Sequence, residues 1–113
     1  MMIAGIGKRV QIYIDEGDTI HGRALYLAIV ERLHEEGAAG ATVTRGIAGF
    51  GAHSRIHSAR LVDIVSPLPL VITWVDTPQQ VDRLLASICE MVTEGLVTVE
   101  EVSIAKYSHR DAS

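Results

Sequence analysis

The sequence predicts an α+β domain of the ferredoxin-like type, in which the elements follow the order β-α-β-β-α-β and two helices cover one face of a four-stranded antiparallel sheet. Two observations carry this prediction. Apolar and polar residues alternate over 8–14, which is the period of a strand, and the mainly apolar run over 70–75 also predicts a strand. Two longer segments space their apolar residues three and four apart, which is the period of a helix.

Length and composition favour one domain with an aliphatic core. The 113 residues suit a single domain, 1–113, and we expect its ordered core over about 8–107. Hydrophobic residues make up 48% of the chain and aromatic residues only 4%. The formal net charge of −4 argues against nucleic acid as a partner, because nucleic-acid-binding domains usually present a basic face.

The first half of the chain supplies the first predicted strand and helix. The strand covers 8–14 and is followed by the polar turn "DEGDT". A helix is expected over about 22–36, because Leu25, Ala28, Ile29 and Leu33 form one apolar stripe. Gly37 stands where a glycine commonly ends a helix.

Three strands and a second helix are expected in the rest of the chain. The second strand is expected over 41–50, a loop over 51–60, and regular pairing of the third strand over 70–75. Thr77, Pro78 and Gln80 predict a helix start with a capping box, and Gly95 marks the expected end of that helix. The last strand is expected over 96–107, with a bulge at Glu100–Glu101, where the alternation changes phase.

The third strand has two apolar faces. Leu70, Ile72 and Trp74 point to one face, whereas Val71 and Val75 point to the other. Helices can cover only one face of the sheet, so the second apolar face needs another partner. We therefore predict a homo-oligomer.

A cationic, glycine-rich stretch stands out in this acidic chain. No Asp or Glu lies between Glu36 and Asp63. The basic residues in this interval are Arg45, His53, Arg55, His57 and Arg60. Gly46, Gly49 and Gly51 would let backbone N–H groups approach a ligand and form a nest for an anion. The pattern favours a small phosphoryl or carboxylate ligand, but it also fits glycines at bulges and arginines paired with acids.

The sequence gives weaker indications of thiol, metal-binding or catalytic chemistry. Cys89 is the only cysteine, so a reducing compartment, the cytoplasm, is expected, and its place beside Ile88 predicts a buried thiol. His53 and His57 lie four residues apart without a third ligand nearby, so no metal site is predicted. Neither His53 nor His57 has a carboxylate close in sequence, and we expect a binding protein and not an enzyme.

Three segments together resemble a known family. They are "ATVTRGIAGFGAHSRIH", "LPLVITWVDTPQQVDRLL" and "EGLVTVEEVSI". They are similar to the PII-like proteins grouped as domain of unknown function 190, over roughly 8–107. The resemblance implies a trimer that binds adenine nucleotides in clefts between subunits. It also implies a T-loop over 51–60, with Gly49, Phe50 and Gly51 at its base, that engages a partner such as a membrane transporter or channel.

One departure from PII proteins concerns the ligand. PII proteins carry a Gly-Asp-Gly-Lys segment between the second helix and the last strand, and its lysine contacts nucleotide phosphates. The corresponding segment here has no lysine and has Glu94, Glu100 and Glu101 nearby. A smaller anion such as AMP, ADP or a cyclic nucleotide therefore fits better than ATP.

The sequence thus predicts a PII-like homotrimeric regulator in the cytoplasm, with no bound cofactor other than an adenine nucleotide ligand. The alternative is a trimeric interaction module without a nucleotide. Lys106 is the basic residue of the last strand that could reach the ligand. The full set of expected ligand-binding residues is Arg45, Gly46, Gly49, Phe50, Gly51, His53, Arg55, His57, Arg60 and Lys106.

Overall fold

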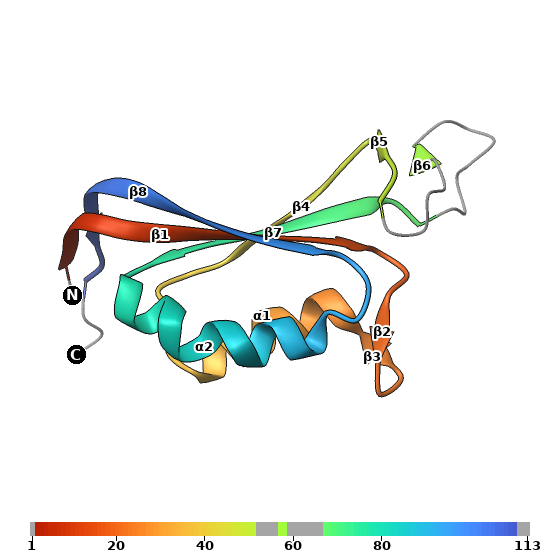
Figure 1. The fold of residues 1–113 in the computed structure, drawn as a ribbon, viewed down its shortest axis with the longest axis horizontal. Coiled ribbons are helices and arrows are strands. Elements are labelled where there is room, and N and C mark those ends of the chain that lie inside the picture. The colour runs from red at the N-terminus through yellow and green to blue at the C-terminus, as the bar shows by residue number, and fades with distance from the viewer. Residues whose placement is uncertain (1, 52–56, 59–66, 111–113) are drawn as a thin grey trace.

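A four-stranded antiparallel sheet forms one layer of the molecule, and two helices cover one of its faces (Figure 1). The computed structural model describes residues 2–51, 57–58 and 67–110. The sheet has the order β4-β7-β1-β8. Its strands are β1 (Met2–Asp15), β4 (Thr42–Arg45), β7 (Pro69–Asp76) and β8 (Leu96–Ser108), and the helices are α1 (Leu25–Glu35) and α2 (Pro78–Met91). The ferredoxin-like prediction is confirmed.

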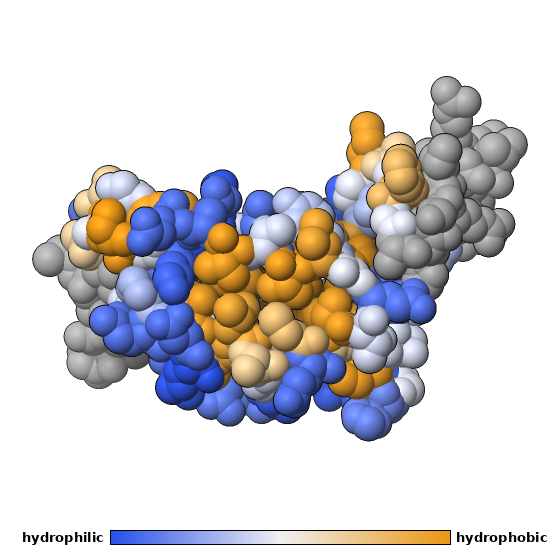
Figure 2. Space-filling model, in the orientation of Figure 1, coloured by the Kyte–Doolittle hydropathy of each residue, from blue (hydrophilic) through white to orange (hydrophobic). Residues whose placement is uncertain are grey.

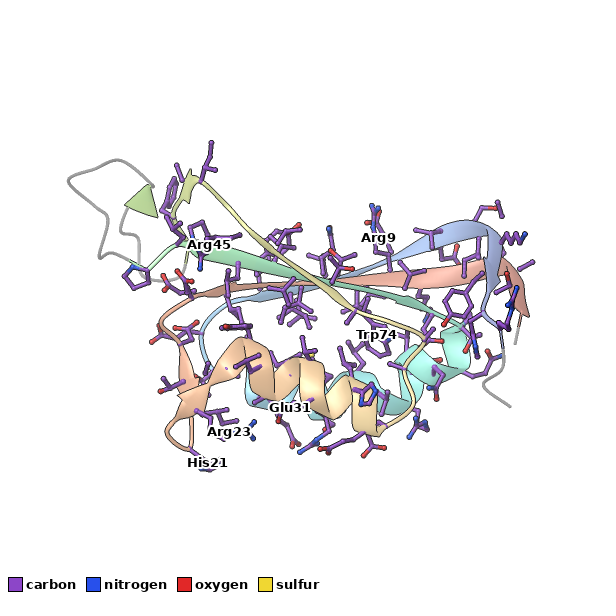
Figure 3. The ribbon with its side chains drawn as sticks, turned by 180° about the vertical axis from the view of Figure 1, so that it is seen from behind. Arg9, His21, Arg23, Glu31, Arg45 and Trp74 are labelled. Atoms are coloured by element: carbon purple, nitrogen blue, oxygen red, sulfur yellow. The ribbon has the colours of Figure 1, made fainter. Side chains whose placement is uncertain are left out.

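The core lies between the helices and one face of the sheet. Alternate residues of β1 and β7 point into it, and Val10, Ile12, Ile72 and Trp74 are fully buried there. Paired residues of neighbouring antiparallel strands share a face, and Val10 pairs with Trp74 and Ile12 with Ile72. The predicted stripe of α1 is buried against them. The side chain of Trp74 lies in this layer in Figure 3.

Both helices end or begin as their sequences indicate. Gly37, just beyond α1, has a left-handed φ of 81°, and Ala38 N donates to Leu33 O at 2.9 Å. Thr77 is the N-cap of α2, and its hydroxyl accepts from Gln80 N at 3.2 Å. The capping box is only half formed, because the Gln80 amide donates to Gly37 O instead.

Asp76 is a buried carboxylate at the end of β7. Its Oδ1 accepts from Thr77 N at 2.9 Å, and its Oδ2 accepts from Ala39 N at 2.8 Å and from Trp74 Nε1 at 3.0 Å. Tyr107 adds a bond from its hydroxyl to Ala39 O at 2.7 Å. The Asp76 bonds fix the connection between α1 and β4 to the start of α2, and the Tyr107 bond fixes it to β8.

A small hairpin that the sequence analysis did not predict precedes α1. It consists of β2 (Thr19–Ile20) and β3 (Arg23–Ala24). His21 and Gly22 form its turn with φ values of 49° and 78°, the left-handed pair of a tight two-residue hairpin. The helix therefore starts at Leu25 instead of near residue 22.

The predicted bulge at Glu100–Glu101 is wrong. The register between β1 and β8 runs without a break through Arg9–Glu100 and Lys8–Glu101. Arg9 Nη2 lies 2.5 Å from Glu100 Oε1, and both side chains reach solvent. The irregularity lies instead between the pairs Ile3–Tyr107 and Gly5–Ile104.

Two apolar surfaces remain outside the core. The first, the open face of the sheet, carries Val71, Val75, Tyr13 and Leu96, the last three with exposed fractions of 36%, 38% and 55%. The second gathers between β8 and α2, as Figure 2 shows. Its residues are Leu85, Val92, Val97 and Val99, of which Val99 is 40% exposed. Cys89 on α2 is exposed, so the prediction of a buried thiol is wrong.

Candidate ligand-binding site at the base of an arm

The predicted second strand divides into a strand of the sheet and an arm. β4 ends at Arg45, and the chain then leaves the sheet and forms β5 (Ala48–Gly49), which pairs with β6 (His57–Ser58). We call residues 46–51 together with β6 the arm. It stands beyond one end of the sheet in Figure 1.

The glycines at the start of the arm allow a close approach to Pro69. Gly46 N donates to Pro69 O at 2.7 Å. A Cβ atom would lie 3.0 Å from Pro69 Cγ at Gly46 and 3.3 Å from it at Gly49, which is tighter than most such contacts. Gly46, Gly49 and Gly51 do not have a left-handed φ, so they do not form the alternating backbone of an anion nest.

Arg45 and Glu16 form a junction at the base of the arm. Arg45 Nη2 donates to Glu16 Oε2, and Glu16 Oε1 accepts from Leu68 N at 3.3 Å. Glu16 N also donates to Leu68 O at 2.9 Å. The Arg45 side chain is 61% exposed, and exposed ion pairs typically contribute only about 0–1 kcal/mol. The acid partner is thus within the same chain, and an anion could displace it at small cost.

The arm also presents two large apolar side chains to solvent. Ile47 is 80% exposed and Phe50 is 72% exposed. Phe50 was expected at the base of the T-loop, whereas Ile47 was not singled out. The sequence pattern over 41–50 does not show that Ile47 is exposed. Its exposure follows from the chain leaving the sheet at Gly46, which the pattern does not indicate.

The structure brings together part of the predicted site. Arg45, Gly46, Gly49, Phe50 and Gly51 share the arm and its base, and His57 pairs with Gly49 across β5 and β6. His53, Arg55 and Arg60 lie outside the described residues. Lys106 lies on β8 between the residues paired with Ile3 and Gly5, which is the end of the sheet remote from the arm. Within one chain it therefore does not meet Arg45.

The connection between α2 and β8 is acidic and tightly packed. Gly95 has a φ of 151°, and a Cβ atom there would lie 2.5 Å from Tyr13 O. Glu94 and Asp18 line a pocket of about 260 Å³ beside this connection, together with Gly17, Thr19, Leu25 and Thr93. Two carboxylates at this position disfavour a polyphosphate.

Among residues 2–51, 57–58 and 67–110, no group of three or more His, Cys, Asp or Glu side chains is placed to hold a metal ion. In the same part of the chain, neither helix has the length and hydropathy required to span a bilayer.

Known proteins share the sequence pattern of this chain. Residues 7–104 match the family model DUF190, described as "Uncharacterized ACR". A UPF0166 protein of Aquifex aeolicus is 34% identical over 97 residues, which cover 86% of this chain and 91% of that protein. A UPF0166 protein of Methanocaldococcus jannaschii is 31% identical over 100 residues, which cover 88% of this chain and 92% of that protein.

Two similar solved structures are of CPII from Thiomonas intermedia K12, described as a nitrogen regulatory PII-like protein. One, bound to ADP, AMP and bicarbonate, has a TM-score of 0.66 at 17% identity and covers 93% of this chain and 92% of that chain. The other, bound to ADP and bicarbonate, has a TM-score of 0.64 at 18% identity with the same coverage. At this level of identity the likeness concerns the fold.

Proposed function

Because this chain belongs to the DUF190 family and shares the PII-like fold, we propose that it is a PII-like regulator that binds a small anionic ligand. The preferred ligand is an adenine nucleotide with one or two phosphates. The ligand lies in a cleft between subunits of a homotrimer, and the segment 51–60 passes its presence to a partner protein such as a membrane transporter or channel. The protein acts in the cytoplasm and is not an enzyme.

The observation that carries this proposal is the junction of Arg45 with the arm. The arginine is exposed, and its pair with Glu16 costs little to exchange for a phosphate. The solved CPII structures that share this fold are described with ADP, AMP, bicarbonate or acetate bound, all of them anions. Glu94 and Asp18 beside the α2–β8 connection favour AMP or ADP over ATP by repulsion of the third phosphate.

The homotrimer is supported by the two apolar surfaces outside the core. Exposed Val75, Tyr13 and Leu96 on the open face would be buried in an assembly. Lys106 and the arm lie at opposite ends of one sheet, so they do not meet within a subunit. An assembly would let Lys106 of one subunit approach the arm of another. Light scattering during size-exclusion chromatography should give three times the 12.2 kDa chain mass. A monomer at micromolar concentration would contradict this part of the proposal.

Binding is tested by titration calorimetry with AMP, ADP and ATP on the full chain and on Arg45→Gln. We expect AMP or ADP to bind more tightly than ATP, and Arg45→Gln to weaken binding about tenfold or more, because a charge-assisted hydrogen bond contributes roughly 1.5–3 kcal/mol. Arg83→Gln is the matched control. Arg83 is an exposed arginine of α2 that pairs with Glu36 at the end of α1, in the helical layer. Equal loss in both variants would contradict a role specific to Arg45.

A second function is favoured by Ile47 and Phe50. Two apolar side chains with exposed fractions of 80% and 72% on one arm are typical of a protein-binding surface. If none of the three nucleotides binds while the trimer forms, the chain is a trimeric interaction module. In that case Ile47→Ser with Phe50→Ser should abolish partner capture, and Arg45→Gln should leave it unchanged.

A further inference from the structure

A second pocket lies between the β2–β3 hairpin and the helices, away from the arm. Its volume is about 250 Å³. That is smaller than the roughly 300–1,000 Å³ of pockets for drug-sized ligands, so it suits a compact metabolite. The residues that line it are Ile20, His21, Arg23, Ala28, Glu31, Arg32, Glu35 and Met91. In Figure 3, Arg23 and Glu31 lie on the helical side of the molecule, whereas Arg45 lies at the base of the arm.

The charges of this pocket balance, but only half of them are paired with each other. Arg23 Nη2 donates to Glu31 Oε2, so these two groups neutralise one another. Arg32 uses Nη1 to donate to Ser87 Oγ at 2.7 Å, a neutral partner that orients the guanidinium. Within the described part of the chain, Arg32 has no carboxylate partner and Glu35 makes no hydrogen bond or direct ion pair. Glu35 is near enough to Arg23 to help Glu31 raise the pKa of that guanidinium. One cation and one anion thus stay available on the same pocket.

Arg32 and Glu35 are spaced for a ligand that carries both charges. They lie three residues apart on α1, so they are neighbours on the helix surface, with about 5–6 Å between Cβ atoms. A ligand with a single negative charge would meet Glu35 and Glu31, and one with a single positive charge would meet Arg32 and Arg23. A zwitterion satisfies both unpaired groups without an added net charge.

The remaining wall of the pocket is apolar. Ala28 is buried, and Ile20 and Met91 are half-buried beside it. The hairpin that presents Ile20 and Arg23 depends on the turn at His21, a residue with a side chain held at a φ of 49°. Left-handed backbone at such a residue carries a cost that often persists at binding sites. The wall would accept an aliphatic side chain.

We propose that this pocket binds a free aliphatic α-amino acid, with its carboxylate on Arg32, its ammonium group on Glu35 and its side chain against Ile20, Ala28 and Met91. This site is separate from the proposed anion site at the arm. The protein would therefore take two kinds of signal, one anionic and one zwitterionic.

The test is calorimetric titration of the full chain with L-leucine and with two analogues that each lack one charge. The analogues are 4-methylpentanoate, which keeps the carboxylate, and 3-methylbutylamine, which keeps the ammonium group. We expect L-leucine to bind and each analogue to bind at least about tenfold more weakly, because each loses a charge-assisted contact. No heat of binding with L-leucine up to about 10 mM, or an analogue that binds as tightly as L-leucine, would overturn the proposal.

Variants locate the site. Arg32→Gln and Glu35→Gln should each weaken the binding of L-leucine at least about tenfold. Ser87→Ala should weaken this binding less, because Arg32 then loses its hydrogen bond to Ser87 but keeps its charge. Glu36→Gln is the matched control, since Glu36 follows Glu35 but pairs with Arg83 outside the pocket. Circular dichroism and thermal melting verify that each variant is folded. Unchanged binding in both Arg32→Gln and Glu35→Gln would refute the assignment.

The same variants separate this inference from the proposed function. Arg32→Gln should leave AMP and ADP binding unchanged, and Arg45→Gln should leave L-leucine binding unchanged, because Arg32 lies on α1 beside the β2–β3 hairpin and Arg45 ends β4. Loss of both ligands in either variant would show that the two sites are not independent and would contradict a separate amino-acid pocket.

Discussion

Replacement of Asp76 by alanine should remove much of the stability of the fold. Asp76 is 3% exposed, and its two oxygens accept three hydrogen bonds. The truncation leaves Ala39 N, Thr77 N and Trp74 Nε1 without an acceptor. Each buried donor without a partner costs about 1–3 kcal/mol, and water that enters the space recovers part of this. We therefore expect a loss of about 3–5 kcal/mol, a large share of the roughly 5–15 kcal/mol typical of a domain.

Two further variants sharpen this test. Asp76→Asn should lose less, about 1–3 kcal/mol, because the amide oxygen can still accept from Trp74 and Ala39 while its NH₂ group faces Thr77 N. Asp82→Ala is the matched control. Asp82 pairs with Lys8 at 3.0 Å but is 66% exposed, so its removal should cost less than about 1 kcal/mol.

The assay is equilibrium unfolding in urea. Far-UV circular dichroism reports the backbone, and the fluorescence of Trp74, the single tryptophan, reports the core. A loss of about 3–5 kcal/mol should lower the urea midpoint by about 2 M at a typical slope. If Asp76→Ala unfolds within about 0.5 M of Asp82→Ala, then the three hydrogen bonds contribute little and our account of this junction is wrong.

Two other substitutions test local structure. Gly95→Ala should cost about 2–4 kcal/mol, because its Cβ would lie 2.5 Å from Tyr13 O at a φ of 151°, whereas Gly40→Ala, with nothing within 4 Å of its Cβ, should be nearly neutral. Urea unfolding measures both, and equal midpoints would contradict the packing described at Tyr13. Thr77→Ala should cost about 1 kcal/mol by loss of the bond to Gln80 N, and thermal melting checks it. An unchanged melting temperature would show that this N-cap contributes nothing.

The spacing of the apolar residues that face the core allowed the sheet and the helices to be predicted. The strands predicted over 8–14 and 70–75 are present, and both bury every second residue under the helices. The helix stripes were equally clear, since α1 and α2 each bury one face. Local patterns suffice where one face of an element is buried and the other is not.

The change of phase in the last strand led to a wrong prediction because its cause is non-local. Val97 and Val99 face the helices, whereas Val102 and Ile104 face the open side, opposite Gly7 and Gly5 on β1. A Cβ at Gly7 would overlap Ile104 Cδ1, so the isoleucine occupies the space that the glycine leaves. The same glycines hid the first residues of β1, which starts at Met2 and not near residue 8.

The candidate site was predictable in composition but not in arrangement. The cationic, glycine-rich stretch was visible as residue types, but Arg45 was expected inside a strand over 41–50, whereas β4 ends at this residue. That Arg45 pairs with Glu16, and that Lys106 lies at the far end of the sheet, depend on pairing between distant segments. The β2–β3 hairpin had one local signal, the adjacent His21 and Gly22, which the helix pattern behind it obscured.

Glu16 links the two segments at the base of the arm, which are the end of β4 and the residues just before β7. One carboxylate holds the end of β4 through Arg45 and the approach to β7 through Leu68. A competitor that drew Arg45 away would release the end of β4, while Leu68 would keep both of its hydrogen bonds to Glu16. Because β7 lies between β4 and β1 in the sheet, such a release of β4 would have a direct route from the surface to the interior strands.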